Sequence, residues 1–349
     1  MAFAEKAVAA LCAGVLVLGG GGAVRAATPQ SEPPLYDSLE ELGEALFFDP
    51  NLSMNRTQSC STCHTPDAGF VDPRETDAGR AVSLGDDGQS LGTRNAPTAS
   101  YAALTPPFHL GTDGKWVGGQ FLDGRAATLE DQAGGPPVNP VEMGMPDHAA
   151  VVDRLRENSD YVAALQALVA PDIFDDADQA YAGMTKALAA YERTPEFAPF
   201  DSKYDRYLRG DYQLTPEEDL GRLLFFSQQF TNCNICHQLK TSPIDPEETF
   251  SNYQYHNIGV PANPAVAAVP DQGLLDNPQV TDPAEAGKFK VPSLRNVAVT
   301  APYMHNGVFR DLRTVVLFYN KYNSKSAARQ INRKRCLSGT LSAPARTAR

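Results

Sequence analysis

The sequence predicts an all-α fold with two helical domains and long irregular loops, and three observations lead to this prediction. The stretch "SLEELGEALFF" is repeated further along as "TPEEDLGRLLFF", so the chain contains an internal duplication. Amphipathic segments with helical spacing recur, whereas the alternating pattern of strands is sparse. The 349 residues are enough for two domains that each bury a core.

Each copy of the repeat carries a helix start signal and an apolar helix face. A capping box opens it, and the L-G-x-x-L-F-F spacing that follows places two leucines on one side. Between the copies, residues 149–168 and 177–191 predict amphipathic helices, and residues 193–201 predict a proline-punctuated linker. Loops rich in Gly, Pro and Asn, such as 111–119 and 259–277, surround the helices. The capping pairs are Ser38 with Glu41 and Thr215 with Glu218, and the leucines are Leu42 and Leu46, then Leu220 and Leu224.

The first 26 residues predict a secretory signal peptide. An apolar run interrupted only by glycines follows Lys6, and "VRA" before Ala27 fits the small-residue rule for cleavage. The run is too short and too rich in glycine for a membrane anchor, and no other stretch could span a bilayer. We therefore expect an exported, periplasmic protein without a membrane span in its mature part.

The charge of the chain is acidic except at its C-terminal end. The formal net charge is -12, and it becomes -13 once residues 1–26 are removed, which argues against nucleic-acid binding. Residues 321–349 contain eight Lys or Arg residues and no acidic one. We treat residues 324–349, which include Cys336, as an atypical basic tail, produced either by a shifted reading frame or truncation or by a genuine extension.

Four of the six cysteines form two copies of the motif C-x-x-C-H. Two thiols at this spacing can reach both vinyl groups of one porphyrin, and the adjacent imidazole is then placed beneath the iron. A zinc site would usually bring its second pair within a few tens of residues, but the motifs are 173 residues apart, and a redox pair or plain disulfides would not need the histidine twice. We therefore predict two covalently bound haem c groups. The attachment residues and proximal ligands are Cys60, Cys63 and His64 in the first motif and Cys233, Cys236 and His237 in the second.

Two haems alone would suit a noncatalytic electron-transfer protein, whereas a peroxidase needs an open iron face and a group that moves protons on hydrogen peroxide. Thr128 can cap a helix that carries Gln132, and a proline-rich loop then leads to Glu142. A carboxylate near haem in an apolar pocket would have a raised pKa and could carry a peroxide proton. An exposed loop glutamate is the commoner outcome, so these residues alone leave both functions open.

From about residue 38 to residue 320 the chain resembles the bacterial dihaem cytochrome c peroxidase and MauG superfamily. The matching stretches, in order, are "LGEALFFDPNLS", "CSTCH", "RNAPT", "DGRAATLEDQA", "NPVEMG", "CNICH", "HNIGVP" and "VPSLRNVAVTAPYMHNG". The resemblance implies two cytochrome c-like haem domains. Residues 27–195 would hold the peroxidatic haem and residues 196–323 the electron-transfer haem.

The resemblance also implies roles for particular residues. Gln132 and Glu142 would be the distal catalytic pair at the first haem. An interdomain calcium ion would be held by the Asn95 side chain and the carbonyl groups of Thr300 and Pro302, which are hard oxygen donors of the kind that calcium prefers.

One departure from the family pattern concerns the distal ligand of the second haem. The family's usual methionine is replaced by Tyr319, as in MauG-like members, and a phenolate donor would stabilise oxidised iron. Asp311 can cap a helix on which Tyr319 shares one face with Leu312, Val315 and Val316, so we expect this tyrosine to point inward. A core tyrosine without a role at iron is the alternative.

Two further departures lie in the first half of the chain. Asp86 or Asp87 occupies the place of the family's distal histidine, so the first iron is expected to be open. Leu122 replaces the tryptophan that lies between the haems in the family, which puts the coupling of the haems in doubt. Trp116, the only tryptophan, is a candidate substitute or a loop anchor. The other histidines are given supporting roles: His305 near the irons, His256 near the second haem, and His109 and His148 on the surface.

The expected function is that of an exported dihaem c-type peroxidase. It would reduce H2O2 at the N-terminal haem with electrons that a small redox protein, a cytochrome c or cupredoxin, delivers through the C-terminal haem. One alternative is a MauG-like enzyme that uses H2O2 to oxidise Trp or Tyr residues of a partner protein, and another is a noncatalytic electron-transfer protein. A homodimer is compatible with all three.

Overall fold

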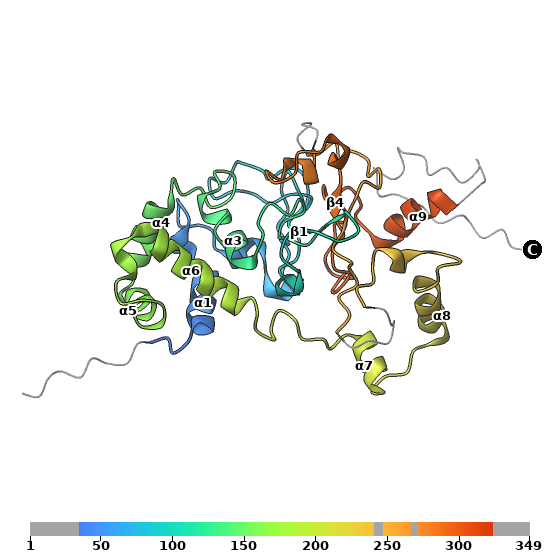
Figure 1. Ribbon diagram of the computed structural model, residues 1–349, viewed down its shortest axis with the longest axis horizontal. Helices are drawn as coiled ribbons and strands as arrows, with labels where there is room; N and C mark the ends of the chain where they lie inside the picture. The colour runs from blue at the N-terminus through green and yellow to red at the C-terminus, as the bar shows by residue number, and fades with distance from the viewer. Residues whose placement is uncertain (1–34, 241–246, 267–270, 324–349) are drawn as a thin grey trace, which may run out of the picture. The chain divides into compact units, whose positions relative to one another are not determined.

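The computed structural model describes residues 35–240, 247–266 and 271–323 (Figure 1). The predicted signal peptide (residues 1–26) and basic tail (residues 324–349) lie outside these residues. The described part is rich in helices and has two short antiparallel sheets. The prediction of a helical protein with few strands is therefore confirmed. No helix in this part has both the length and the apolar character needed to cross a membrane.

The regular elements are short and are separated by long loops, as Figure 1 shows. The α-helices are α1 (Leu39–Phe48), α2 (Cys60–Cys63), α3 (Leu129–Ala133), α4 (His148–Arg156), α5 (Ser159–Leu168), α6 (Ala177–Tyr191), α7 (Lys203–Arg209), α8 (Pro216–Phe225) and α9 (Leu312–Asn323). Short 3-10 helices are η1 (Pro50–Leu52), η2 (Pro66–Ala68), η3 (Ala102–Leu104), η4 (Pro136–Val138), η5 (Ile173–Asp175), η6 (Cys233–Ile235), η7 (Leu274–Asp276) and η8 (Pro283–Glu285). Strand β1 (His109–Leu110) pairs with β2 (Trp116–Val117), and β3 (Tyr255–His256) pairs with β4 (Phe289–Lys290).

Both predicted N-caps of the repeat are present, but the complete capping box forms only at the second copy. At the start of α1, the Ser38 hydroxyl accepts the backbone N–H of Glu41 at 3.2 Å, whereas the Glu41 carboxylate accepts the backbone N–H of Asp37 at 2.9 Å. At the start of α8, Thr215 and Glu218 exchange two side-chain-to-backbone hydrogen bonds of 3.0 and 3.2 Å. These bonds satisfy N–H groups that have no partner within a helix, so each copy of the repeat begins a helix at the predicted place.

The prediction of one helix over residues 149–168 is wrong, because the chain breaks it into α4 and α5. The Asn158 side chain accepts the backbone N–H of Asp160 at 2.9 Å and so caps a new helix. An asparagine offers the backbone this local alternative to a continuous helical ladder. The predicted helix over residues 177–191 coincides with α6, and residues 193–201 contain no regular helix or strand.

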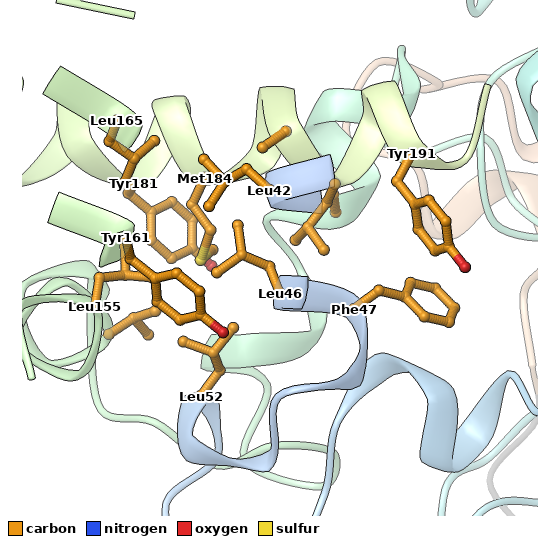
Figure 2. Close-up of a cluster of buried hydrophobic side chains, with 14 of the residues drawn as sticks. Leu42, Leu46, Phe47, Leu52, Leu155, Tyr161, Leu165, Tyr181, Met184 and Tyr191 are labelled. Carbon is orange, nitrogen blue, oxygen red and sulfur yellow. The ribbon is translucent and has the colours of Figure 1, made fainter. Parts of the chain in front are cut away.

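The largest core lies where α1 crosses α6. Figure 2 shows Leu42, Leu46 and Phe47 of α1 directed toward Met184 and Tyr191 of α6, and these side chains are buried. The close approach depends on Gly43, since a Cβ atom at this position would lie 1.9 Å from the carbonyl oxygen of Ala187. Close packing here joins the first copy of the repeat to the helices that follow it.

The second copy of the repeat packs differently. Leu220 and Leu224 of α8 are 57% and 37% exposed, although the matching leucines of α1 are fully buried. A Cβ atom at Gly221, the counterpart of Gly43, would meet nothing within 4 Å. The same local sequence therefore forms the same helix in both places, but the described residues cover the apolar face of the first helix only.

Residues of the two predicted haem domains are bonded to each other. The Arg94 guanidinium pairs with Asp271 at 2.6 Å, and the N–H of Gly118 donates to the carbonyl of Tyr253 at 3.0 Å. Arg295 pairs with Asp205 at 2.5 Å in the interior and stacks over the ring of Tyr101. The boundary at residues 195 and 196 stays a prediction, and packing crosses it at many points.

Candidate haem sites

The first C-x-x-C-H motif is one turn of helix followed by an oriented imidazole. The N–H of His64 donates to the Cys60 carbonyl at 2.9 Å, which keeps the histidine directly after the turn of α2. The Nδ1 atom of His64 donates to the carbonyl of Phe70 at 3.1 Å, and Phe70 has a left-handed backbone with φ +57°. With Nδ1 engaged, Nε2 is the nitrogen that can bind iron.

The second motif repeats this arrangement with a different loop. The N–H of His237 donates to the Cys233 carbonyl at 2.9 Å, and Nδ1 donates to the carbonyl of Phe250 at 3.0 Å. Phe250 again has a left-handed backbone, with φ +56°. Burial lowers the pKa of both histidines, so the imidazoles are held neutral, as a metal ligand must be.

The cysteine chemistry fits thioether attachment better than the alternatives. Cys60, Cys63, Cys233 and Cys236 form no disulfides. Burial raises the pKa of Cys60 to about 12 and that of Cys63 to about 11, whereas a reactive redox pair requires a lowered thiol pKa. No group of three or more His, Cys, Asp or Glu residues suited to a metal ion occurs among the described residues, so the two motifs do not form a shared zinc site.

His256 adds an observation at the second motif. Its Nε2 atom is buried without a hydrogen-bond partner within the described part of the chain. Its charge would lower the pKa of His237, which places it near that ligand, as predicted. A buried polar atom of this kind is normally satisfied, so His256 is compatible with a further group next to the second motif.

Glu142 lies near the first motif and is partly buried. Burial raises the pKa of its carboxyl group, and the charge of Arg125 opposes this shift. The negative charge of Glu142 in turn raises the pKa of Cys63, which puts the carboxylate within electrostatic range of the attachment site. A carboxyl group can accept a proton and return it, and a raised pKa makes the protonated form easier to reach.

Gln132 is held on α3 in the same folded loop as Glu142. Thr128 and Asp131 cap this helix reciprocally. The loop then closes through a hydrogen bond of 3.3 Å from the N–H of Met143 to the carbonyl of Pro136. The predicted distal pair thus comes from one loop whose backbone is fixed by capping and turn bonds, and its catalytic role stays a prediction.

Asp86 and Asp87 are both engaged within their own surroundings. The Asp86 carboxylate is buried and accepts hydrogen bonds from Ser53 at 2.7 Å and Thr57 at 2.6 Å. Its backbone N–H donates to the carbonyl of Glu142 at 2.7 Å. Asp87 accepts from Ser90 at 2.6 Å and closes a local turn. Both carboxylates are thus held by hydrogen bonds to nearby groups, and Asp86 connects the Glu142 loop to the loop before the first motif.

The prediction that Tyr319 points inward is wrong for the described structure. Tyr319 is 40% exposed and Val316 is 65% exposed, whereas Thr314 and Phe318 form the buried face of α9. Phe318 packs against Phe309 with ring centroids 5.2 Å apart, and this larger aromatic contact sets the rotation of the helix. The role of Tyr319 as an iron ligand stays a prediction.

The interhaem position and its candidate substitute lie in well-packed surroundings. The Leu122 carbonyl accepts the backbone N–H of Lys290 at 3.0 Å. Trp116 stacks on Phe108 with ring centroids 4.7 Å apart, as expected of a loop anchor. Phe108 also contacts Tyr255 edge to face, so the tryptophan belongs to a small apolar cluster.

The remaining histidines are placed as follows. The Nδ1 atom of His109, an exposed residue of β1, donates to the carbonyl of Pro107, and His148 pairs with Asp178 on the surface, so both surface predictions hold. His305 stacks on Phe289 with ring centroids 3.8 Å apart, and burial lowers its pKa to about 4.

The predicted calcium residues are brought into the same region. The backbone N–H of Asn95 donates to the carbonyl of His305 at 2.7 Å, close in sequence to Thr300 and Pro302. The side-chain nitrogen of Asn95 donates to the carbonyls of Arg80 and Ala81 at 3.3 and 3.1 Å, so its oxygen is the atom left to face a cation. The calcium ion itself stays a prediction.

Several residues of these sites could not have been found from sequence. The carbonyl groups of Phe70 and Phe250 accept the histidine hydrogen bonds because of the backbone conformation at these residues, and no sequence motif predicts that conformation. Asp86 gave a signal only as a departure from the family pattern. Lys290 gave no signal, because a lysine in a sequence is ordinarily exposed.

Comparison with known proteins agrees with this geometry. The model of the di-haem cytochrome c peroxidase family matches residues 37–213. Methylamine utilization protein MauG of Paracoccus denitrificans is 52% identical over 314 residues, covering 88% of this chain and 80% of the relative. The chain belongs to this family.

Other relatives of this dihaem peroxidase family are more distant. Cytochrome c peroxidase Ccp of Escherichia coli is 32% identical over 269 residues, covering 76% of this chain and 49% of the relative. The crystal structure of the diheme peroxidase BthA from Burkholderia thailandensis matches with a TM-score of 0.76 and 33% identity, covering 85% of this chain and 77% of that one. The chain is thus a MauG-like member of a family of oxidoreductases that act on peroxide, and the family implies two haem cofactors.

Proposed function

We propose that this protein is a periplasmic MauG-like enzyme that uses hydrogen peroxide to oxidise a tryptophan or tyrosine of a partner protein. The observation that carries the proposal is the bonding of Asp86 and Asp87. By the resemblance, one of these two residues stands where classical family members close the first iron with a histidine. The Asp86 carboxylate is bound to Ser53 and Thr57, and the Asp87 carboxylate is bound to Ser90. Peroxide would therefore reach the first haem without prior activation.

Two other features support the proposal. Tyr319 replaces the methionine expected in cytochrome c peroxidases, and an anionic ligand favours retention of an oxidising equivalent. Identity to MauG of Paracoccus denitrificans is 52%, against 32% to the Escherichia coli cytochrome c peroxidase. We further propose that residues 27–195 and 196–323 form two haem c domains, and that the Asn95 side chain and the carbonyl groups of Thr300 and Pro302 would hold a calcium ion.

The two haems would be attached through the cysteines of both motifs and bound by His64, His237 and Tyr319, and they supply the redox chemistry. The residues of the chain supply the proton transfers. In its ionised form, Glu142 would take a proton from the peroxide and return it to the departing oxygen, which leaves as water. The Gln132 amide would orient the peroxide by hydrogen bonding. His64 would keep its ring fixed through the Phe70 carbonyl.

A second candidate is the reduction of peroxide with electrons from a small redox protein, a cytochrome c or cupredoxin. It is supported by relatives of this name, such as cytochrome c551 peroxidase of Pseudomonas aeruginosa, at 30% identity over 81% of this chain. The two candidates share Glu142 and differ in the source of the electrons. Turnover of a reduced cytochrome by the purified holoprotein, compared with mass changes in exported proteins after peroxide addition, separates them.

Glu142→Gln tests the shared chemistry. This substitution keeps the shape but removes the proton acceptor, so we expect the reaction with peroxide to slow by roughly 100- to 10,000-fold. In the wild-type protein the rate should fall as the pH drops through the raised pKa of Glu142, because the carboxyl group is then protonated. The variant should lack this acid limb in a stopped-flow pH profile.

The matched control is Glu130→Gln, the same substitution twelve residues earlier in the chain. Glu130 pairs with Arg193 at 2.7 Å at the surface, and such pairs contribute little. This variant should react with peroxide at the wild-type rate. Equal rates in Glu142→Gln and the wild type would exclude Glu142 as the proton carrier.

A further inference from the structure

Lys290 is a partly buried lysine between segments that belong to the two halves of the chain. Its backbone N–H donates to the carbonyl of Leu122 at 3.0 Å, and it is the partner of Tyr255 across the β3–β4 pair. Its ammonium group donates to the carbonyl of Gly119. The lysine is therefore fixed on both its backbone and its side chain by elements that come from distant parts of the sequence.

The Gly119 carbonyl is itself a rigid acceptor. Gly119 has a φ of +74°, and a Cβ atom there would lie 2.8 Å from the carbonyl oxygen of Gly124 and 2.9 Å from the Cβ of Phe108. Only glycine fits this turn without displacing its neighbours. The ammonium group is thus held at a defined place and does not extend along a surface.

The charge of Lys290 is not balanced by the described residues. An ammonium group has three N–H donors and prefers an anion, but the contact here is one neutral carbonyl. Asp123 is the acidic residue that acts on it electrostatically, and that carboxylate is already paired with Arg94 at 2.5 Å and Arg125 at 2.9 Å. Burial accordingly lowers the pKa of Lys290 to about 7.

Hydrogen bonds connect the segment of Lys290 to the second motif. The next residue, Val291, donates its N–H to the carbonyl of Gln254 at 2.9 Å and accepts from the hydroxyl of Ser251 at 2.7 Å. Asn252, in the same segment, donates its N–H to the carbonyl of Cys236 at 2.8 Å. Lys290 and His237 are both partly buried, so each retains some accessible surface.

We propose that Lys290 binds a propionate carboxylate of a haem, and that this contact sets the reduction potential of that haem. Each haem carries two propionates, and a carboxylate is an anion that can pair with the ammonium group of Lys290. Segment 251–256 connects Lys290 to the second motif, and this favours the second haem over the first. The inference rests on haem attachment and does not depend on the substrate proposed above.

The test compares the holoproteins of Lys290→Met and Lys288→Met with the wild type. Both substitutions remove one positive charge, but Lys288 already pairs with Glu285 at 2.9 Å. We expect Lys290→Met to lower the midpoint potential of one haem, because an unpaired propionate stabilises ferric iron. Lys288→Met should leave both potentials unchanged. Separate spectroelectrochemical titration of the high-spin and low-spin signals identifies the haem.

Several outcomes would overturn the inference. One is that both haems of a Lys290→Met protein with full haem content keep the wild-type midpoint potentials. Another is that Lys288→Met shifts a midpoint potential as much as Lys290→Met does. A wild-type potential that depends on added chloride or phosphate would indicate a free anion in place of the propionate. If Lys290→Met does not fold, Lys290→Gln keeps a donor for Gly119 and gives the same comparison, and Lys290→Arg should retain the wild-type potential.

Failure of the proposed function is distinguishable from failure of this inference. The potentials are measured without peroxide and without a partner protein. A preparation that oxidises no partner can still show the shift, and an active preparation with unshifted potentials would exclude the propionate contact alone.

Discussion

Glu192 is a buried carboxyl group for which the proposed chemistry has no use. It follows the last residue of α6 and is 8% exposed. Burial raises its pKa to about 8, and its negative charge contributes to the raised pKa of Cys60. Ionising a buried carboxyl group costs free energy. The pH dependence of stability therefore shows whether Glu192 is protonated in the interior beside the first motif.

Glu192→Gln should remove a pH dependence of stability. The folded-state pKa lies above the usual 4.5, so the stabilisation is complete below about pH 4.5 and is lost as the pH rises toward 8. The free energy of unfolding of the wild type should fall by at most about 5 kcal/mol over this range, and that of the variant should fall much less. Urea unfolding at pH 5 and pH 8 measures the difference.

Glu196→Gln is the control for this prediction. Glu196 is exposed and lies four residues further along, where it accepts a hydrogen bond from Tyr191 at 3.1 Å. The free energy of unfolding of this variant should change with pH as it does in the wild type. A Glu192→Gln protein with the same slope as the wild type would mean that Glu192 ionises freely in the folded state.

Prediction from sequence worked for residues whose chemistry is local. The C-x-x-C-H spacing fixes which cysteines and histidines act together, and the structure gives both histidines the same hydrogen bonding. Prediction from sequence failed where contacts between distant segments determine the orientation of a helix. The rotation of α9, which exposes Tyr319, follows from the contact between Phe318 and Phe309, and helix periodicity cannot contain that information.

At the scale of elements, the duplicated helix provides an internal comparison. Helices α1 and α8 share their caps and their L-G-x-x-L-F-F spacing, and both could be predicted. Their environments could not, because the partner of α1 is α6, and no described helix covers the corresponding face of α8. The local sequence determined that a helix forms, and tertiary packing determined whether its apolar face is buried.

Gly43→Ala and Gly221→Ala should therefore have opposite effects. The first places a methyl group 1.9 Å from the backbone of Ala187, so α1 and α6 must separate, at a cost of about 1–3 kcal/mol or more. The second meets nothing within 4 Å and should stabilise α8 by about 0.5–1 kcal/mol through its helix propensity. Urea unfolding of the two variants gives the comparison, and equal effects would contradict the packing described for α1.

At the scale of the whole molecule, polar contacts join parts of the chain that the sequence presents as separate domains. Arg94 contacts three carboxylates, those of Asp123, Asp271 and Asp276. Only the first of these belongs to the same predicted domain. The duplication in the sequence correctly suggested two similar haem motifs. It did not predict the ion pairs between the two predicted domains, because a sequence pattern does not indicate which distant charged residues pair.

The number of haems per chain is the prediction that belongs to this scale. A double substitution of Cys60 and Cys63 by Ala should leave one covalent haem, and so should a double substitution of Cys233 and Cys236. The wild type should carry two. Intact-protein mass spectrometry and haem absorbance per protein measure the count. A wild-type mass without haem, from cells that mature c-type cytochromes, would contradict attachment at both motifs.

Phe70 and Phe250 have one more consequence. The loop from His64 to Phe70 and the loop from His237 to Phe250 differ in length, yet each ends in the same unfavourable backbone conformation with its carbonyl on the imidazole. The hydrogen bond that would tune each proximal imidazole is therefore alike in both halves. In the proposed arrangement, a functional difference between the two haems would originate on the sides opposite His64 and His237, where we propose Glu142 for the first haem and Tyr319 for the second.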